Sequence, residues 1–320
     1  MLYHYFAEDG WNFMFFQEYL KGRVGLGIFF LFGLLFLGAC SNAGVGSVSS
    51  SPSSSSIPVV AAENFYGDIT QQIGGSRVNV TSIISDPNID PHTFEANPKY
   101  TRAIGGATLV IENGGGYDDW MDKLLSSTPS TKRQVLKGFD LATVKIPDNE
   151  HVWYSYENAD SIATAIARQL EVIDNGHSSE YKSNLQVFKK SLQGLQDKIS
   201  EIKGKYQGTA VGLTETIFQY QTGPMNLAVK TPEAFQKAMA EGNDPPASAV
   251  AITEDQVNKR QIKVLIVNQQ TTSKFTDTLQ SEAKVQNIPI VAVTETMPGG
   301  KTYQTWMLDQ LDQLEQALKK

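Results

Sequence analysis

The stretch that decides the fold is YKSNLQVFKKSLQGLQDKISEIKGKY, residues 181–206, because it predicts one unbroken helix. Apolar residues recur along it at alternating spacings of four and three, no proline interrupts it, and polar residues fill most other positions. At about 1.5 Å per residue, a helix of about 28 residues spans roughly 40 Å. The apolar positions are Tyr181, Leu185, Phe188, Leu192, Leu195, Ile199, Ile202 and Tyr206.

This regular stripe has two interpretations. It fits a coiled coil between chains, and it fits a helix that lies along two lobes of one chain. Only one such segment exists, and globular patterns flank it on both sides. We therefore interpret residues 177–206 as a single rigid connecting helix that restricts hinge motion, and we expect a monomer.

The segment before the helix, residues 57–176, alternates short apolar runs with helical patterns. Such alternation predicts βαβ units and a mainly parallel sheet. A further strand is expected around Val144, and the last helix is expected to end at Gly176. The strand candidates are 58–62, 78–84 and 107–111, and the helix candidates are 63–74, 98–106 and 158–174.

The segment after the helix, residues 207–320, repeats the pattern. Thr231 is the expected N-cap and Pro232 the first residue of a helix that stops near Gly242. The fold class is therefore α/β: two lobes, each a mainly parallel sheet flanked by helices, joined by one long helix, with the functional site in the cleft between them. The strand candidates are 209–213, 263–267 and 288–293, and the closing helix is 303–319.

The N-terminus has the features of an export signal. An uncharged apolar run of 16 residues, 24–39, follows Lys21 and Arg23 and leads into Cys40. That run is short for a membrane span and suits a signal-peptide core. Small residues before a cysteine resemble a bacterial lipoprotein signal, which implies cleavage before Cys40 and a lipid on its sulfur. The alternative is a signal anchor with an incidental cysteine.

Three further expectations concern the same region. Cys40 is the only cysteine, so no intrachain disulfide competes for it. Residues 41–56 are rich in serine and glycine and predict a flexible tether after a signal peptide of residues 1–40. Acidic residues precede Lys21, which a signal peptide normally avoids there, so Met14 is a candidate start of translation.

Length and charge narrow the possible functions. The chain has 320 residues, which suggests two domains, and 41% hydrophobic residues, enough for real cores. Its formal net charge of −7, with no lysine or arginine block, excludes nucleic acid as a partner. The run 299–302, GGKT, looks like the end of a phosphate loop, but Glu295 stands where that pattern needs glycine.

Two histidines lie in loops of the first half. His92 occurs in SDPNIDPHTFE, residues 85–95, after a predicted strand, and His151 occurs in NEHVW, residues 149–153, after the strand expected around Val144. Each alone is more often packed or solvated, whereas together they form a candidate imidazole pair. Of the others, His4 lies in the leader and His177 among polar residues at the start of the long helix.

The second half repeats Thr-Glu-Thr directly after two predicted strands. Glu215 follows the strand 209–213, and Glu295 follows the strand 288–293. Open α/β sheets bind ligands at the carboxyl ends of their strands, which is where both glutamates are expected. Two imidazoles and two carboxylates suit Mn²⁺, Fe²⁺ or Zn²⁺.

The motifs DPHTFE and NEHVW, the single long connecting helix and the lipoprotein signal together resemble the metal-binding solute receptors of ABC importers that serve manganese and zinc. The resemblance covers essentially all of residues 57–320. It implies that His92, His151, Glu215 and Glu295 hold one cation in the cleft. Glu215 stands where zinc-type members have histidine and manganese-type members often have glutamate. Glu295 matches a position that is usually aspartate, and Glu150 replaces the commoner proline before the second histidine.

The resemblance implies a protein that is not an enzyme. It would be lipid-anchored on the outer face of the bacterial cytoplasmic membrane, at a Gram-positive cell surface, and deliver Mn²⁺, or next Zn²⁺, to an ABC permease with a separate ATPase. Two alternatives remain. A metal-dependent hydrolase would need an open coordination position and a general base, and a surface adhesin lipoprotein would bind its partner without the histidines.

Overall fold

The computed structural model describes residues 56–89, 91–95 and 97–320. The fold below is that of one compact unit, to which all of these described residues belong. The predicted signal peptide, Cys40 and the tether up to residue 55 lie outside the described residues. Within the described part, no helix has the length and apolar character needed to cross a membrane.

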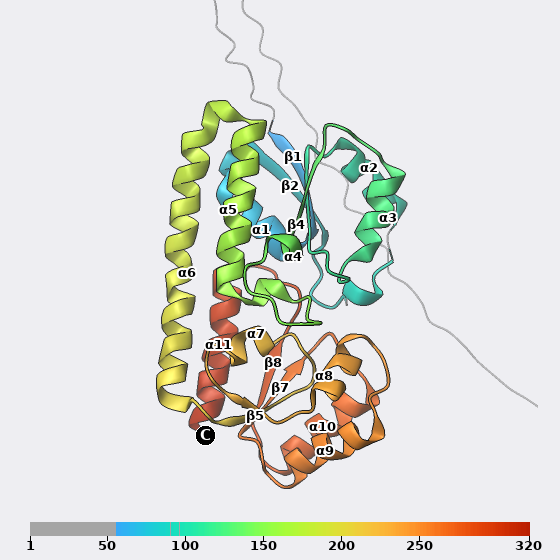
Figure 1. The fold of residues 1–320 in the computed structure, drawn as a ribbon, viewed down its shortest axis with the longest axis vertical. Coiled ribbons are helices and arrows are strands. Elements are labelled where there is room, and N and C mark those ends of the chain that lie inside the picture. Colours follow the sequence, from blue (N-terminus) through green and yellow to red (C-terminus); the bar gives the residue numbers. More distant parts are fainter. Residues whose placement is uncertain (1–55, 90, 96) are drawn as a thin grey trace, which may run out of the picture. The chain divides into compact units, whose positions relative to one another are not determined.

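The first lobe is built on a four-stranded parallel sheet of order β2-β1-β3-β4. Alternate residues of β1 face opposite sides, as a strand requires. Val59 and Ala61 join the core under α1 and α5, whereas Val60 and Ala62 pack toward α2 and α3 (Figure 1). The strands are β1 (Ile57–Glu63), β2 (Val78–Ile84), β3 (Leu109–Glu112) and β4 (Gln134–Lys137).

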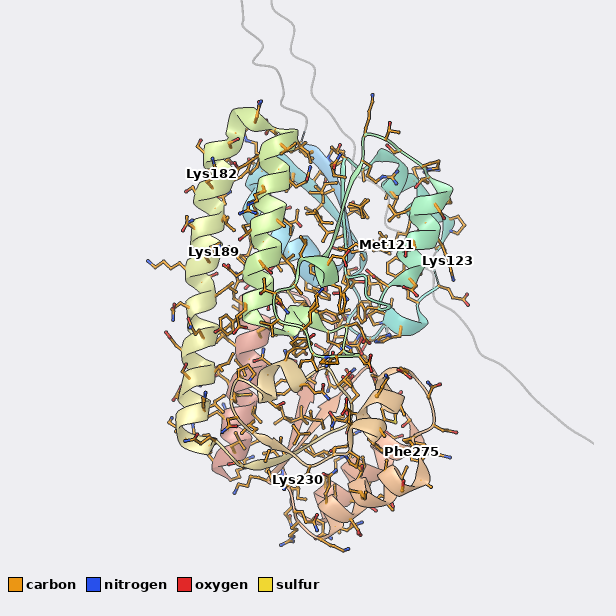
Figure 2. All side chains as sticks on the ribbon, in the orientation of Figure 1. Met121, Lys123, Lys182, Lys189, Lys230 and Phe275 are labelled. Atoms are coloured by element: carbon orange, nitrogen blue, oxygen red, sulfur yellow. The ribbon has the colours of Figure 1, made fainter. Side chains whose placement is uncertain are left out.

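Helices cover both faces of this sheet. On α3, Met121 is buried in the core, whereas Lys123 is exposed (Figure 2). The helices are α1 (Asn64–Gly74), α2 (Pro98–Gly106), α3 (Asp119–Ser127), α4 (Gly138–Leu141) and α5 (Tyr156–Ile173), with short 3-10 turns η1 (Gly75–Arg77), η2 (Pro91–Thr93), η3 (Val152–Tyr154) and η4 (Asn175–His177).

The second lobe has the same strand order in a second parallel sheet, β6-β5-β7-β8. Along β7, Leu265 and Val267 face α8, α9 and α10, while Val264 and Ile266 face α11. The strands are β5 (Ala210–Leu213), β6 (Ala228–Val229), β7 (Val264–Asn268) and β8 (Ile290–Val293), and the helices are α7 (Gln219–Thr222), α8 (Glu233–Ala240), α9 (Ala247–Asn258), α10 (Lys274–Val285) and α11 (Tyr303–Lys319).

The long helix α6 (Ser178–Tyr206) has 29 residues and runs beside both lobes (Figure 1). It packs against α1 and α5 of the first lobe and α11 of the second. Its apolar stripe is buried from Tyr181 to Ile202, while Lys182 is exposed on the outer side (Figure 2). The stripe is therefore covered by the same chain, which confirms the connecting-helix interpretation.

Aromatic side chains fill the interface between the lobes next to α6. Phe65 stacks on Trp153 with ring centroids 4.6 Å apart, and its ring centroid is 6.1 Å from that of Trp306 of the second lobe. The hydroxyl of Tyr154 donates to the carbonyl of Thr294 at 2.6 Å. We call Phe65, Trp153, Tyr154 and Trp306 the aromatic seam; all four are buried.

Two expectations of local structure were wrong. Val144 lies in a loop, where its N–H and carbonyl bond the side chain of Asn158 at 2.8 and 2.7 Å, and the strand is instead β4. The N-cap of α8 is Pro232, because the hydroxyl of Thr231 accepts from the N–H of Leu213 at 3.0 Å and so belongs to the sheet.

Candidate metal centre

His92 lies in η2, on the loop that follows β2. Its ring meets that of Tyr117 edge-on, with centroids 4.8 Å apart. Its Nε2 lies 3.6 Å from Oε1 of Glu150 and 3.8 Å from Oε2 of Glu295. This loop thus places one imidazole nitrogen between two carboxylates, one from each lobe.

His151 is fully buried at the start of η3. Its Nδ1 lies 2.9 Å from Oδ1 of Asn149, which also accepts from the His151 N–H at 3.1 Å. An amide oxygen only accepts, so Nδ1 carries the proton, and the lone pair is on Nε2. Nε2 has no hydrogen-bond partner among the described residues. Burial lowers the pKa of His151 well below its usual value, and His92 lowers it further, which keeps the ring neutral.

Glu295 is buried two residues after β8, at the predicted carboxyl end of the strand. Its Oε1 accepts from Nδ2 of Asn268 at 2.6 Å, and its Oε2 accepts from the hydroxyl of Tyr117 at 3.0 Å. Its backbone N–H donates to Oε1 of Gln270 at 2.6 Å. These bonds fix a carboxylate of the second lobe against a tyrosine of the first.

Glu215 is buried two residues after β5. Its Oε2 accepts from the N–H of Ile217 at 3.2 Å, and its Oε1 has no hydrogen-bond partner within the described chain. Burial raises the pKa of Glu215 well above the usual value, and the nearby charge of Glu295 raises it further. A second buried carboxylate therefore lies close enough to Glu295 to repel it.

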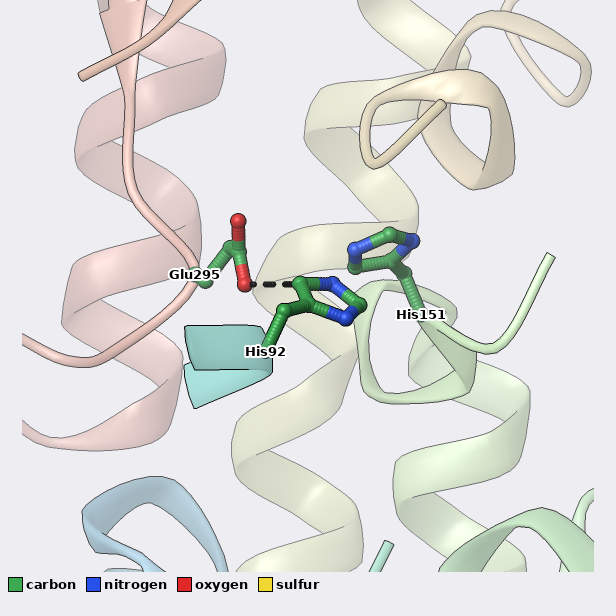
Figure 3. A group of neighbouring side chains, drawn as sticks. All are labelled: His92, His151 and Glu295. Carbon is green, nitrogen blue, oxygen red and sulfur yellow. Dashed lines mark ion pairs between the residues drawn. The ribbon is translucent and has the colours of Figure 1, made fainter. Parts of the chain in front are cut away.

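Three of the four predicted ligands converge. His92, His151 and Glu295 each offer one ligand atom, and these atoms all lie within 4.8 Å of one another (Figure 3). Two atoms bound at about 2.1 Å to the same ion are at most about 4.2 Å apart, so a small inward shift suffices for one ion to touch all three. Glu215 is outside this group of three, although it is buried and electrostatically coupled to Glu295.

The charge balance of the site favours a cation. The neutral imidazole of His151 and two buried carboxylates meet there, and burying carboxylates without a compensating charge is costly. Two buried ligand atoms, Nε2 of His151 and Oε1 of Glu215, lack hydrogen-bond partners among the residues described. A divalent cation would offset the charge of the carboxylates and would also give these two atoms a partner.

Several supporting residues were missed by sequence reasoning. Asn149 orients His151, and its Nδ2 also donates to the carbonyl of Thr216 at 2.9 Å, across the cleft. Asn268 is the last residue of β7, so the strand-end argument that found Glu295 would have found it too. Tyr117 follows the glycine turn 114–116, in which all three glycines have positive φ, and no sequence signal connected it with the histidines.

Comparison with known proteins adds to this geometry. The model of the ZnuA family, described as the periplasmic zinc-uptake complex component A, matches residues 59–317. The chain belongs to this family. ZnuA-family proteins are substrate-binding components of uptake systems, so the chain is not an enzyme, and the hydrolase alternative is dropped.

Relatives of the chain differ in the metal that their names carry. The manganese ABC transporter substrate-binding lipoprotein scaA of Streptococcus gordonii is 27% identical over 322 residues, covering 92% of this chain and 98% of its own. The iron ABC transporter substrate-binding lipoprotein MtsA of Streptococcus pyogenes serotype M1 is 27% identical over 190 residues, covering 55% of this chain and 59% of its own.

Among solved structures, the periplasmic zinc binding protein TroA from Treponema pallidum has a TM-score of 0.70 at 17% identity, covering 82% of this chain and 99% of its own. At that identity the likeness establishes the fold, two parallel-sheet lobes with a long helix. Both the family and the architecture expected from the sequence are thus confirmed.

Proposed function

We propose that this chain is an extracytoplasmic receptor that captures one divalent metal ion, Mn²⁺ in preference and Zn²⁺ next, and delivers it to an ABC permease driven by a separate ATPase. The ligands are His92, His151, Glu215 and Glu295. The protein works as a monomer, held on the outer face of the bacterial membrane by a lipid on Cys40.

The observation that carries this proposal is the meeting of imidazoles from one lobe with a carboxylate from the other, within 4.8 Å. A ligand set divided between lobes couples ion binding to the lobe interface. The ion can shift the population toward a closed form only by its difference in affinity for the two forms. Glu215 approaches as a fourth ligand because its buried carboxylate, destabilised by Glu295, gains from the same cation.

The choice of manganese rests on ligand chemistry. Two carboxylates beside two imidazoles suit Mn²⁺, whereas nitrogen- and sulfur-rich sets favour Zn²⁺. Zinc still binds most sites of this kind more tightly at equilibrium, following the usual order of divalent ions. Relatives named for manganese and for iron match the chain, which supports a transition-metal cargo without selecting one.

The sequence and the names of the relatives support the proposed membrane anchor. The apolar run that ends at Cys40 is a lipoprotein signal, and the serine-rich residues 41–56 are the tether. The streptococcal relatives are themselves named lipoproteins. Labelling of growing cells with a radioactive fatty acid tests the anchor: it is expected to mark the wild-type chain and not Cys40→Ala.

The experiment that tests the receptor is a metal titration. The full-length chain, purified in detergent, is titrated with Mn²⁺ and Zn²⁺ by calorimetry, and elemental analysis counts the bound metal. We expect one ion per chain and, for His92→Ala, an affinity lower by about 100-fold, because even residues that only support ligands are worth 10–100-fold.

The matched control is His177→Ala. His177 is a partly buried histidine bonded to Asp174 beside the first turn of α6, outside the cleft. It should leave metal affinity unchanged. A wild-type chain that bound neither metal, or equal losses in both variants, would contradict the proposed receptor.

A further inference from the structure

The proposed ligands differ in their access to solvent. The side chains of His151, Glu215 and Glu295 are 0%, 2% and 1% exposed, whereas that of His92 is 19% exposed. Nε2 of His92 is itself buried, so an ion that arrives from outside with the lobes in this arrangement meets the partly exposed carboxylate of Glu150 before that nitrogen. The side chain of Glu150 is exposed to a similar extent, 17%.

A pocket of about 380 Å³ leads to these two side chains. His92 and Glu150 are part of its lining, and the three buried ligands are not. Gly115 and Gly116 line it as well, so this part of its wall has no side chains. The pocket thus ends at an imidazole and a carboxylate of the first lobe, with the rest of the metal centre behind them.

Glu150 is positioned by the rigid part of the first lobe. Its carbonyl accepts from Nδ2 of Asn113 at 3.0 Å and from the N–H of Val152 at 2.7 Å. Asn113 is itself buried directly after β3. The backbone at Glu150 is therefore fixed, and its carboxylate extends toward His92.

The distance between the two groups allows them to share an ion. Oε1 of Glu150 lies 3.6 Å from Nε2 of His92, and two atoms about 2.1 Å from one ion can be up to about 4.2 Å apart. Glu150 is absent from the group of His92, His151 and Glu295 that lies within 4.8 Å. An ion held by Glu150 and His92 would therefore lie to one side of an ion held by His92, His151 and Glu295.

We infer that His92 and Glu150 form an outer site that receives the divalent cation from solvent, and that the cation then passes from this outer site to His151, Glu295 and Glu215. This inference rests on the proposed function. It assigns Glu150 to the path of the ion, where it governs the rate of loading more than the final affinity. A carboxylate at the floor of a pocket concentrates cations and raises association rates by about 10- to 1,000-fold.

The same pocket supplies a matched control. Asp148 also lines it, two residues from Glu150, but its carboxylate lies 3.0 Å from Nζ of Lys237. Lys237 lines the pocket as well, so the control removes both partners together, as Asp148→Asn with Lys237→Gln, and leaves the net charge of the pocket unchanged. Asp148 has a φ of 53°, a conformation that asparagine tolerates, so Asp148→Asn changes charge without backbone strain.

The experiment mixes the full-length chain with Mn²⁺, and separately with Zn²⁺, in a stopped-flow instrument. A competing fluorescent metal indicator reports the free metal over time. For Glu150→Gln we expect association and dissociation rate constants both lower by about tenfold, since a cation-attracting carboxylate is lost from the path. The dissociation constant should then change by less than about threefold. The double variant Asp148→Asn, Lys237→Gln should change each rate by less than about twofold, because it leaves the net charge of the pocket unchanged.

The outcomes separate the inference from the function it rests on. If the wild type binds neither metal, the proposed receptor fails. If the wild type binds and Glu150→Gln loads at the wild-type rate, the outer site is wrong and the receptor stands. A normal association rate with a much weaker dissociation constant would also overturn the inference, because Glu150 would then hold the bound ion instead of receiving it.

Discussion

The two lobes share one strand order but present different chemistry at their strand ends. In each lobe the central strand leads into a buried glutamate, Glu63 at the end of β1 and Glu215 just after β5. Burial raises the pKa of Glu63 well above its usual value, with Asp118 adding to the shift. In the first lobe the proposed metal ligands are instead imidazoles on loops, whereas in the second lobe they are acids at the strand ends.

This difference shows how one topology can supply two kinds of ligand. Glu215 and Glu295 come two residues after their strands, so the sheet itself aims them. His92 and His151 come eight and fourteen residues after β2 and β4, so their positions depend on supports such as Asn149. The first lobe should therefore be more sensitive to the loss of supporting residues than the second.

The largest effect is expected for His151→Ala. This variant removes Nε2 of His151, a buried nitrogen that has no hydrogen-bond partner among the described residues. We expect metal affinity to fall by about 100-fold or more, since supporting residues alone are worth 10–100-fold. Isothermal titration with Mn²⁺ measures it, and a loss under tenfold would mean that the second lobe holds the ion without the imidazole pair.

The two carboxylates of the second lobe should differ. Glu295 belongs to the converging group, and Glu215 lies outside it. We expect Glu295→Gln to weaken binding by roughly 30-fold and Glu215→Gln by about tenfold, within the range seen for residues around metal sites. Parallel titrations of the two variants give the order. If Glu215→Gln left both affinity and metal preference unchanged, its place among the ligands would be lost.

An effect similar to that of Glu215→Gln is expected for a residue that does not touch the ion. Asn149→Ala removes the acceptor that holds the proton on Nδ1 of His151. The ring would then lose its fixed tautomer and orientation, so we expect affinity to fall by about tenfold. The same change to aspartate keeps the acceptor and should restore most of the affinity, which a merely structural role for Asn149 would not predict.

The smallest effect lies away from the cleft, where α11 meets α6. Glu315 pairs with Lys198 at 2.8 Å and Lys205 at 3.1 Å, and these partners lower the pKa of Glu315 to about 2. We expect Glu315→Gln to lower the melting temperature at pH 7 by roughly 2–4 °C. Glu254→Gln, on α9, is the control and should change it less.

The pH dependence of that pair has a definite sign. The carboxyl has a lower pKa in the folded chain than its value of about 4.3 in an unfolded one, so the ionised form stabilises the fold above that value. As pH falls from about 4.3 toward about 2, the difference in melting temperature between wild type and Glu315→Gln should disappear. A difference that persisted at pH 2 would mean that the side chain acts through packing and not through charge.

Most of the fold could be predicted from hydrophobic patterns. The helix α6 could be predicted because the period of its apolar stripe matches a helix over many turns. The strands that were missed, β4 and β6, are a half-exposed strand and a two-residue strand with no apolar run of their own. Val144 was misread because its neighbourhood is apolar, although its backbone groups bond Asn158 and not a sheet.

The site could be predicted only in part. The topological position of Glu215 and Glu295 follows from the strand-end rule, and the geometry places Glu295 with the two histidines. The position of Glu215 relative to His92, His151 and Glu295 depends on its loop, in which the N–H of Ile217 donates to the Glu215 carboxylate. No residue pattern predicts that local bond. Glu150 was noticed only as a departure from a motif, because its proximity to His92 arises from two loops that are distant in sequence.

One hydrophobic cluster runs without a break from β1 through the aromatic seam and the stripe of α6 to β8 and α11. One face of each sheet therefore packs on apolar surface that it shares with the other lobe. A chain severed after Tyr206 would expose half of that cluster on each fragment, so the fragments should aggregate instead of folding separately. On heating, both sheets should melt together in a single calorimetric transition, because the loss of either one removes the packing of the other.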